Sequence, residues 1–349
     1  MPTERPIRLS VIIPNYNHAP FLKRCLDSVL SQSRLPEELL VLDDGSTDNS
    51  LEILEVYAQR HPNIRILRND SNQGLNRGLV RLLAEASGDY IYGLGADDFV
   101  LPQFFESAMA AGSLHPSAGI IFGRVRYVDE SGQPLDHSGG DQWRTWDESR
   151  FLSTSEFLND YLARHCVTHS LSSTTIYRTE ALREAGGFKP ELGAWTDTFA
   201  LRAVGLKYGA FFLNHDCNCF TIGSDAFSAK SMADPWNMLD IVNRAARLMR
   251  SPEFCDFFPE AHVKWWETGY RRIVIDNALV ACEDMYNQAG SKYFHIATKK
   301  GGMRKCMAVS LMKAAGFFRR MQFWWLKRCL RNYASDSNET KSLTVERKS

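Results

Sequence analysis

The stretch RLSVIIPNYNHAPFLKRCLDSVLSQSRLPEELLVLDDGSTDNS, residues 8–50, contains a strand–helix–strand pattern. Its first apolar run is rich in β-branched residues and ends at Pro14, which predicts a buried strand. Pro20 suits the first turn of a helix, and apolar residues recur after it at helical spacing. A second apolar run then ends in Asp43 and Asp44. This stretch therefore predicts two neighbouring strands joined by a helix.

The same alternation continues beyond residue 50. Apolar runs at residues 63–69 and 89–95 predict two further strands, and residues 51–61 and 74–87 predict the helices that precede them. Strands that alternate with helices are typical of a mostly parallel sheet with helices on its faces. We therefore expect an α/β fold.

Polar residues follow several of the predicted strands. The acid pairs Asp43-Asp44 and Asp97-Asp98 each come after an apolar run. In parallel sheets, ligands bind beyond the carboxyl ends of the strands. Adjacent carboxylates repel each other unless solvent, a cation or hydrogen bonds relieve the charge. The pattern predicts a cation and ligand site at this edge, and the simpler alternative is a solvated turn with a helix cap.

Composition limits the class of protein. The 349 residues include 41 basic and 41 acidic residues, and 44% are hydrophobic, as in soluble globular proteins. The polar N-terminal segment lacks the apolar core of a secretory signal, and no apolar run is long enough to predict a spanning helix. The eight cysteines show no disulfide or zinc spacing, so we expect reduced thiols in a cytoplasmic protein.

The C-terminal part is much more basic than the rest of the chain. Residues 286–334 contain eleven Lys and Arg residues and neither Asp nor Glu. Within residues 303–332, basic and apolar residues fall on opposite sides of a predicted helix. This pattern is typical of a helix that lies on an anionic membrane surface. The alternative is a helix docked on its own domain or in an oligomer. No recognition motif accompanies the charge, so we expect no nucleic-acid partner.

Three longer segments carry a family resemblance. They are SVIIPNYNHAPFLKRCLDSVLSQS with ELLVLDDGSTDNS, then SNQGLNRGLVRLLAEASGDYIYGLGADDFVLPQ, and finally SSTTIYRTEALREAGGF with WTDTFALRAVGLKYG. Together they resemble the family 2 glycosyltransferases, which are inverting enzymes of the GT-A fold. The resemblance implies a Rossmann-like sheet and a nucleotide-sugar donor, with UDP as the expected nucleotide. We expect a GT-A domain at residues 1–225, a helical extension at 226–300, the basic amphipathic helix at 301–333 and a disordered tail at 334–349.

The resemblance also implies roles for residues at the donor site. Asp43 matches a carboxylate that accepts a hydrogen bond from the nucleobase or ribose, and a carboxylate suits the imide N–H of uracil because it offers no competing proton. Asp44 and Ser46 either contact the donor or only shape the turn. Asn72 and Gly74 match a loop near the donor. The residues expected to bind the donor are Pro14, Asn15, Asn17, Asp43, Asp44, Asn72, Gly74 and Asp98.

Asp97 matches the second acid of the family's metal motif, which is usually Asp-x-Asp followed by another Asp. The match implies a ligand to Mg²⁺ or Mn²⁺, whose shell a diphosphate and water would complete. The sequence departs from the motif at Gly95, which stands where the family has its first Asp. Asp98 is either a second contact to the ligand or a cap for the helix after Pro102.

Asp197, within WTDTFALR, matches the family's catalytic base. Inversion needs one base that takes the proton of the acceptor hydroxyl while the anomeric carbon is attacked opposite the leaving group. The alternative is that Asp197 caps the helix that follows.

The expected activity is therefore metal-dependent transfer of a sugar to a hydroxyl of a lipid-linked or cell-surface glycan precursor, in polysaccharide or cell-envelope synthesis. We expect it at the inner face of the membrane. The other interpretation, motivated by Gly95, is a non-catalytic relative that binds sugar nucleotides or glycans.

Overall fold

The computed structural model describes residues 6–135, 146–162, 172–223, 234–275, 277 and 328. Apart from residue 328, the predicted basic helix and the tail lie outside the described residues. The chain divides into two compact units, Met1–Ala229 with Leu248–Glu260 and Lys230–Arg247 with Ala261–Ser349.

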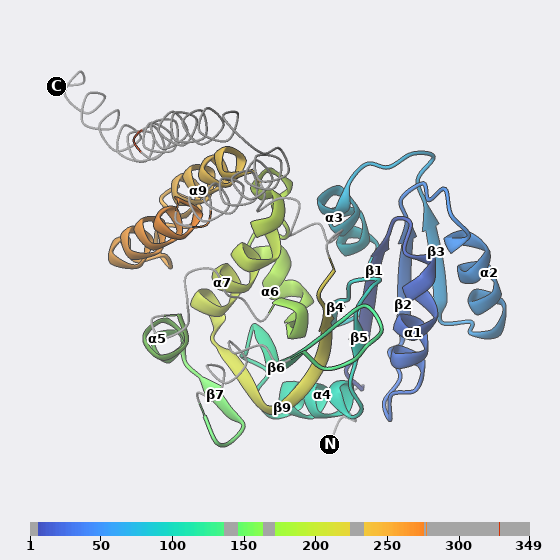
Figure 1. Cartoon of the computed structure of the whole chain (residues 1–349). Coiled ribbons are helices and arrows are strands. Elements are labelled where there is room, and N and C mark those ends of the chain that lie inside the picture. Colours follow the sequence, from blue (N-terminus) through green and yellow to red (C-terminus); the bar gives the residue numbers. More distant parts are fainter. Residues whose placement is uncertain are drawn as a thin grey trace, which may run out of the picture. The chain divides into compact units, whose positions relative to one another are not determined.

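The first part of the first unit alternates strands and helices as predicted (Figure 1). Its elements are β1 (Leu9–Asn15), α1 (Ala19–Leu30), β2 (Glu38–Asp43), α2 (Ser50–Arg60), β3 (Ile64–Arg68), α3 (Leu75–Glu85) and β4 (Tyr90–Gly93). The four strands are parallel and lie in the order β3-β2-β1-β4. The prediction of a mostly parallel α/β half is confirmed.

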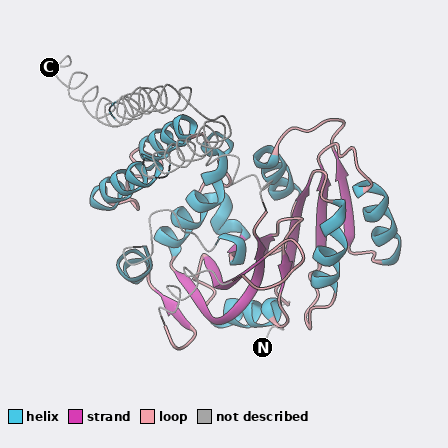
Figure 2. Cartoon of the chain, viewed as in Figure 1, coloured by secondary structure: helices cyan, strands magenta, loops and turns pink. Residues whose placement is uncertain are grey.

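The second part of this unit extends the same sheet. Its elements are β5 (Phe99–Val100), α4 (Phe104–Leu114), β6 (Ile120–Val128), β7 (Arg150–Leu152), α5 (Thr154–Glu156), the π-helix η2 (Phe157–Leu162), the 3₁₀ helix η3 (Ser172–Thr174), β8 (Ile176–Arg178), α6 (Thr179–Glu184), the 3₁₀ helix η4 (Pro190–Trp195), α7 (Thr196–Tyr208) and β9 (Ala210–Thr221). Strand β8 runs antiparallel to β4 and β6, and β9 runs parallel to β6 and antiparallel to β5 and β7. Figure 2 shows these strands side by side, with helices packed around them.

The buried core fixes the edge of the sheet where the polar residues gather. Residues 11–13 of β1 and 39–42 of β2 are fully buried, as expected for central strands covered on both faces. The parallel register then places Asn15 directly beside Asp43. The next strand ends at the same edge, because Ile12 of β1 pairs with Gly93 of β4.

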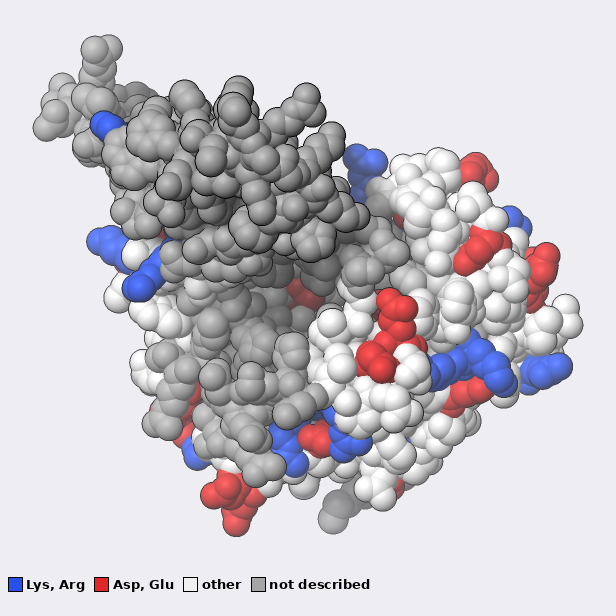
Figure 3. All heavy atoms as spheres, viewed as in Figure 1, with Lys and Arg blue, Asp and Glu red and all other residues white. Residues whose placement is uncertain are grey.

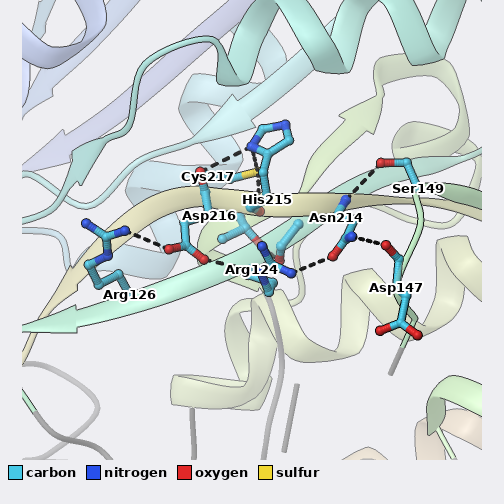
Figure 4. A network of polar contacts seen from close by, with 10 residues as sticks. Arg124, Arg126, Asp147, Ser149, Asn214, His215, Asp216 and Cys217 are labelled. Atoms are coloured by element: carbon cyan, nitrogen blue, oxygen red, sulfur yellow. Dashed lines mark hydrogen bonds and ion pairs between the residues drawn. The ribbon is translucent and has the colours of Figure 1, made fainter. Parts of the chain in front are cut away.

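Strand β9 is irregular where it runs beside β6. The register between the two strands shifts on both sides of Arg124. Arg124 and Arg126 reach the Asp216 carboxylate from either side, at 3.2 and 2.7 Å (Figure 4). Arg124 also donates to the Asn214 side chain, and the Asn214 backbone N–H donates to Ser149 Oγ at 2.9 Å. These contacts hold the irregular part of β9. Beyond it, the end of β9 at Thr221 contacts Asp97 and Asp98, which follow β4.

Charges of both signs are interspersed on the surface of the described residues. Figure 3 shows Lys and Arg side chains beside Asp and Glu side chains on one face. Exposed ion pairs such as Arg65–Glu85 and Arg250–Glu260 contribute to this mixture. The local basic segment of the sequence, residues 286–334, lies outside the described residues apart from Arg328.

The second unit is helical where the structure describes it. It contains most of α9 (Pro235–Met249) and the helical residues 261–275. Arg271 joins these two helices, because it donates to the Asn243 side chain and pairs with Glu267 at 2.7 Å. The predicted α-helical extension is confirmed at this level. No helix in the described part of the chain is long and apolar enough to cross a membrane.

Candidate active site

Side chains join the loops that follow β1 and β2. Asn15 Nδ2 donates to Asp43 Oδ1 at 3.0 Å and to Ser46 Oγ at 3.2 Å. Asn17 adopts a left-handed φ of 57°, and its Oδ1 accepts the backbone N–H of Thr47 at 2.8 Å. The structure therefore brings together Asn15, Asn17 and Asp43, three of the residues expected to bind the donor.

Tyr16 is a further candidate that the sequence analysis did not assign. It lies between Asn15 and Asn17 and is 39% exposed. Asn15 is the strand partner of the buried Asp43. An exposed aromatic ring can stack on a nucleobase, and a carboxylate can accept the N–H of that base. Its signal in the sequence is its position directly after the end of a predicted strand, at Pro14-Asn15.

Asp44 anchors the loop that precedes α3. Its Oδ1 accepts from Asn69 Nδ2 at 2.5 Å and from the Gln73 backbone N–H at 2.9 Å, and its Oδ2 accepts from the Gly74 N–H at 2.8 Å. Asn72 Oδ1 also faces the Gly74 N–H, at 2.8 Å. Three hydrogen bonds of 2.5 to 2.9 Å from this loop favour a turn-shaping role for Asp44.

The turn after β4 carries Asp97 and Asp98, and the end of β9 holds it. Asp98 Oδ1 accepts the Thr221 N–H at 2.8 Å, and Thr221 Oγ1 donates to the Asp97 carbonyl at 2.7 Å. Gln103 occupies the N-cap position of α4 and makes no side-chain cap. The alternative that Asp98 caps this helix is therefore wrong.

Gly95 leaves room for both carboxylates of this turn. A Cβ at Gly95 would lie 2.8 Å from Asp97 Oδ1 and 3.1 Å from Asp98 Oδ2, so two carboxylate oxygens converge beside the glycine. Burial, and then the charge of Asp97, raise the pKa of Asp98 well above its usual range, whereas the Thr221 N–H and Arg24 oppose the rise. Two converging oxygens where negative charge is destabilised fit a hard divalent cation.

The protein supplies few ligands at this place. Among the described residues, no three His, Cys, Asp or Glu side chains gather as a metal-binding group. A cation beside Gly95 would therefore complete its shell with water and ligand oxygens, as Mg²⁺ commonly does.

Arg24 of α1 ties three segments together around the acidic turn. Its Nη2 donates to the Asp97 carbonyl at 3.1 Å and to Thr221 Oγ1 at 3.3 Å, and its Nη1 donates to the Glu130 carbonyl at 3.2 Å. The guanidinium also lies 4.7 Å from the centre of the Phe99 ring. No motif marks Arg24 in the sequence, where it is one basic residue of a predicted helix.

Asp197 lies half-buried in the first turn of α7. Its Oδ1 accepts the Thr198 N–H at 2.6 Å, and its side chain forms a second hydrogen bond with the Ser172 side chain. Burial raises the pKa of Asp197, and these hydrogen bonds limit the rise. Trp195 occupies the N-cap position of α7, so Asp197 does not act as its cap. A carboxylate with a raised pKa suits a general base.

Asn76 of α3 fixes the turn that leads to the predicted base. Its Nδ2 donates to the carbonyls of Pro190 and Gly193, at 3.3 and 2.8 Å. The helix that begins at the Asp44-held loop is thereby joined to the segment before α7.

Comparison with known proteins assigns the chain to a family. Residues 10–186 match the model of glycosyl transferase family 2. This match spans half of the chain, and the chain therefore belongs to glycosyl transferase family 2. The family predicted from the sequence motifs is confirmed.

Curated relatives share different portions of the chain. The glycosyltransferase YibD of Escherichia coli is 38% identical over 102 residues, which is 29% of either chain. MT1568 of Mycobacterium tuberculosis is 26% identical over 280 residues, covering 78% of this chain and 85% of the relative. Chondroitin synthase of Escherichia coli is 29% identical over 145 residues, covering 42% of this chain and 21% of the synthase. The aligned region therefore covers less than a third of the length of YibD and of the chondroitin synthase.

Solved structures show the same fold. S. aureus TarS in complex with UDP-GlcNAc has a TM-score of 0.60 at 21% identity, covering 76% of this chain and 71% of TarS. The mannosyltransferase PcManGT of Pyrobaculum calidifontis, in complex with GDP-Man and Mn²⁺, has a TM-score of 0.53 at 18% identity, covering 97% and 88%. These likenesses confirm the predicted GT-A type of α/β fold.

Proposed function

We propose that this protein is a metal-dependent inverting glycosyltransferase that moves a sugar from a nucleoside diphosphate sugar to an acceptor hydroxyl. The observation that carries the proposal is the placement of the acidic turn and of Asp197 at one edge of the sheet. Tyr92 at the end of β4 pairs with Ile176 at the start of β8. Ser172, whose side chain is hydrogen-bonded to Asp197, lies just before β8 and therefore at that same edge.

The donor nucleotide would occupy the loops after β1 and β2. Asp43 supplies a buried acceptor, and Tyr16, which follows the strand partner of Asp43, supplies an exposed ring. A carboxylate that accepts an imide N–H favours uracil, so we propose a UDP-linked donor. TarS was solved with UDP and with UDP-GlcNAc, and PcManGT with GDP-Man, which supports a nucleotide-sugar donor of this kind.

Asp97 and Asp98 are the residues that would hold Mg²⁺ or Mn²⁺ together with the donor diphosphate. When bound, the cation supplies charge stabilisation for the departing nucleoside diphosphate. Mn²⁺ accompanies GDP-Man in the PcManGT structure, which supports this assignment. Arg24 and Thr221 hold the backbone of the turn, so the two carboxylates stay oriented toward the ligand.

Asp197 would take the proton of the acceptor hydroxyl. We propose a lipid-linked or cell-surface glycan precursor as acceptor and a peripheral location at the inner face of the membrane. The support is the basic amphipathic pattern of residues 303–332, which lie outside the described residues except residue 328. Anionic lipid attracts such a segment, and this would bring the catalytic unit to a lipid-linked acceptor.

The test is release of nucleoside diphosphate from a panel of nucleotide sugars, with Mn²⁺, with Mg²⁺ and with EDTA, in the presence of anionic vesicles and lipid extract. We expect metal-dependent release from one donor. Asp197→Asn should keep donor binding and lose most of the turnover, since general-base catalysis contributes about 10²–10⁴-fold. Asp256→Asn, an exposed position in the same unit, is the matched control. Donor binding without release from any sugar would instead support the non-catalytic relative.

A further inference from the structure

The carbonyl of Ser173, in the middle of η3, receives side-chain hydrogen bonds from two strands. Tyr92 Oη of β4 donates to it at 2.7 Å, and Asn218 Nδ2 of β9 donates to it at 2.8 Å. Both donors are fully buried. Thr174 Oγ1 adds a third link, because it donates to the Gly123 carbonyl of β6 at 2.9 Å. Three strands therefore hold a turn of three residues.

The same turn presents Ser172 to Asp197. The Asp197 carboxylate is hydrogen-bonded to the Ser172 side chain, to the Thr198 N–H and to the Thr198 side chain. Both Thr198 groups belong to α7 itself, whereas the Ser172 hydroxyl comes from outside the helix. The direction of the carboxylate relative to the sheet thus depends on where η3 places this hydroxyl.

We propose that Ser172 is a positioning residue for Asp197, and that Tyr92 and Asn218 keep it in place through the Ser173 carbonyl. The inference rests on the proposed function, in which Asp197 is the base. A hydroxyl has a single proton to donate, and a carboxylate is its strongest acceptor. The bond fixes the rotamer of Asp197 and stabilises its ionised form, which is the form that accepts a proton.

Titratable groups from β8, η2 and α7 lie near Asp197 among the described residues. From β8, Tyr177 Oη donates to the Asp197 carbonyl at 3.3 Å, and burial, followed by Asp197 and Tyr161 of η2, raises the pKa of Tyr177 well above its usual range. On α7, Arg202 donates to the Thr198 carbonyl at 3.3 Å. Because its pKa is raised, Tyr177 stays neutral in the range where a carboxylate titrates. Because Ser172→Ala leaves Thr198 and these groups in place, a change in the titration of Asp197 in that variant reports on the Ser172 hydroxyl.

The test compares Ser172→Ala and Tyr92→Phe with the wild type by two measurements. The first is the pKa of Asp197, followed by ¹³C NMR of labelled aspartate carboxyls and assigned by the signal absent from Asp197→Asn. The second is the pH profile of kcat, with the KM for the donor. Tyr90→Phe is the matched control, because it removes a buried hydroxyl from the same strand. Ser172→Thr keeps a hydroxyl and should retain wild-type behaviour.

We expect the pKa of Asp197 to rise in Ser172→Ala, and to rise less in Tyr92→Phe. The acid limb of the kcat profile should move to higher pH, and kcat should fall by roughly tenfold while the donor KM stays unchanged. An unchanged pKa of Asp197 in folded Ser172→Ala overturns the proposal. The NMR titration needs no turnover, so this result is distinct from failure of the proposed function, which would appear as an inactive wild type or an active Asp197→Asn.

Discussion

Gly95 provides the sharpest test of the acidic turn. In Gly95→Ala, the new Cβ would lie 2.8 Å from Asp97 Oδ1 and 3.1 Å from Asp98 Oδ2, and a Cβ contact below 3.0 Å forces a shift. Asp98 is held by the Thr221 N–H at 2.8 Å, so the Asp97 carboxylate is the group that moves. An off-rotamer side chain costs about 0.5–1.5 kcal/mol. If this cost opposes cation binding, the affinity for Mn²⁺ falls by about two- to tenfold.

The measurement is a titration of free Mn²⁺ by electron paramagnetic resonance, with UDP present, alongside the melting temperature. Gly93→Ala is the matched control, because a Cβ there would meet only Ile12 Cγ1, at an ordinary 3.9 Å. Gly95→Asp should also weaken binding, since its side chain would enter the space that the two carboxylates share. A folded Gly95→Ala that binds Mn²⁺ as tightly as the wild type refutes the idea that the carboxylates converge on a cation beside this glycine.

Other residues of the site give independent tests. Arg24→Lys keeps the charge but loses the planar fork that bridges three segments, so we expect a raised donor KM, and a wild-type value would contradict the bridging role. Asp43→Asn replaces one acceptor oxygen with a donor, and calorimetry with UDP should show binding weaker by about 1–3 kcal/mol. The kcat should decline as pH falls through the raised pKa of Asp197, because a protonated carboxyl accepts no proton. Asp216→Asn leaves two partly exposed arginines without their ion pairs, and urea unfolding should show a loss of about 1 kcal/mol or less.

The strands and helices between β1 and β4 were predictable because the residues that mark them lie within or beside each element. Residues 8–50 show the apolar runs, the prolines and the acids in the order in which the elements begin and end. The parallel order then follows from the alternation of strands and helices, and with it the common edge that holds Asp43 and Asp97. The resemblance to a known family supplied the position of Asp197, which no local pattern would mark as a base.

The residues that hold the site were not predictable, because their partners are distant in sequence. Arg24 forms a hydrogen bond with Thr221, which lies far from it in the sequence. Ser172 and Asp197 form a hydrogen bond only because η3 and α7 meet in the fold. Asp44 shows another limit of prediction from the sequence, because its role could not be assigned from its position. An acid after a strand looks the same whether it binds a ligand or the loop of the next helix, and only the contacts to Gly74 and its neighbours separate the two roles.

The geometry of β4 explains how the two sides of the proposed reaction keep their spacing. Inversion needs the leaving diphosphate and the base on opposite faces of one anomeric carbon, so an error in either position costs rate. Tyr92 holds the Ser173 carbonyl in the turn that we propose orients Asp197, and three residues later the same segment reaches Gly95 beside the acidic turn. A displacement of β4 would therefore carry both groups together. Tyr92→Phe is therefore expected to act at the proposed base, although Tyr92 belongs to the strand that leads to the proposed cation site.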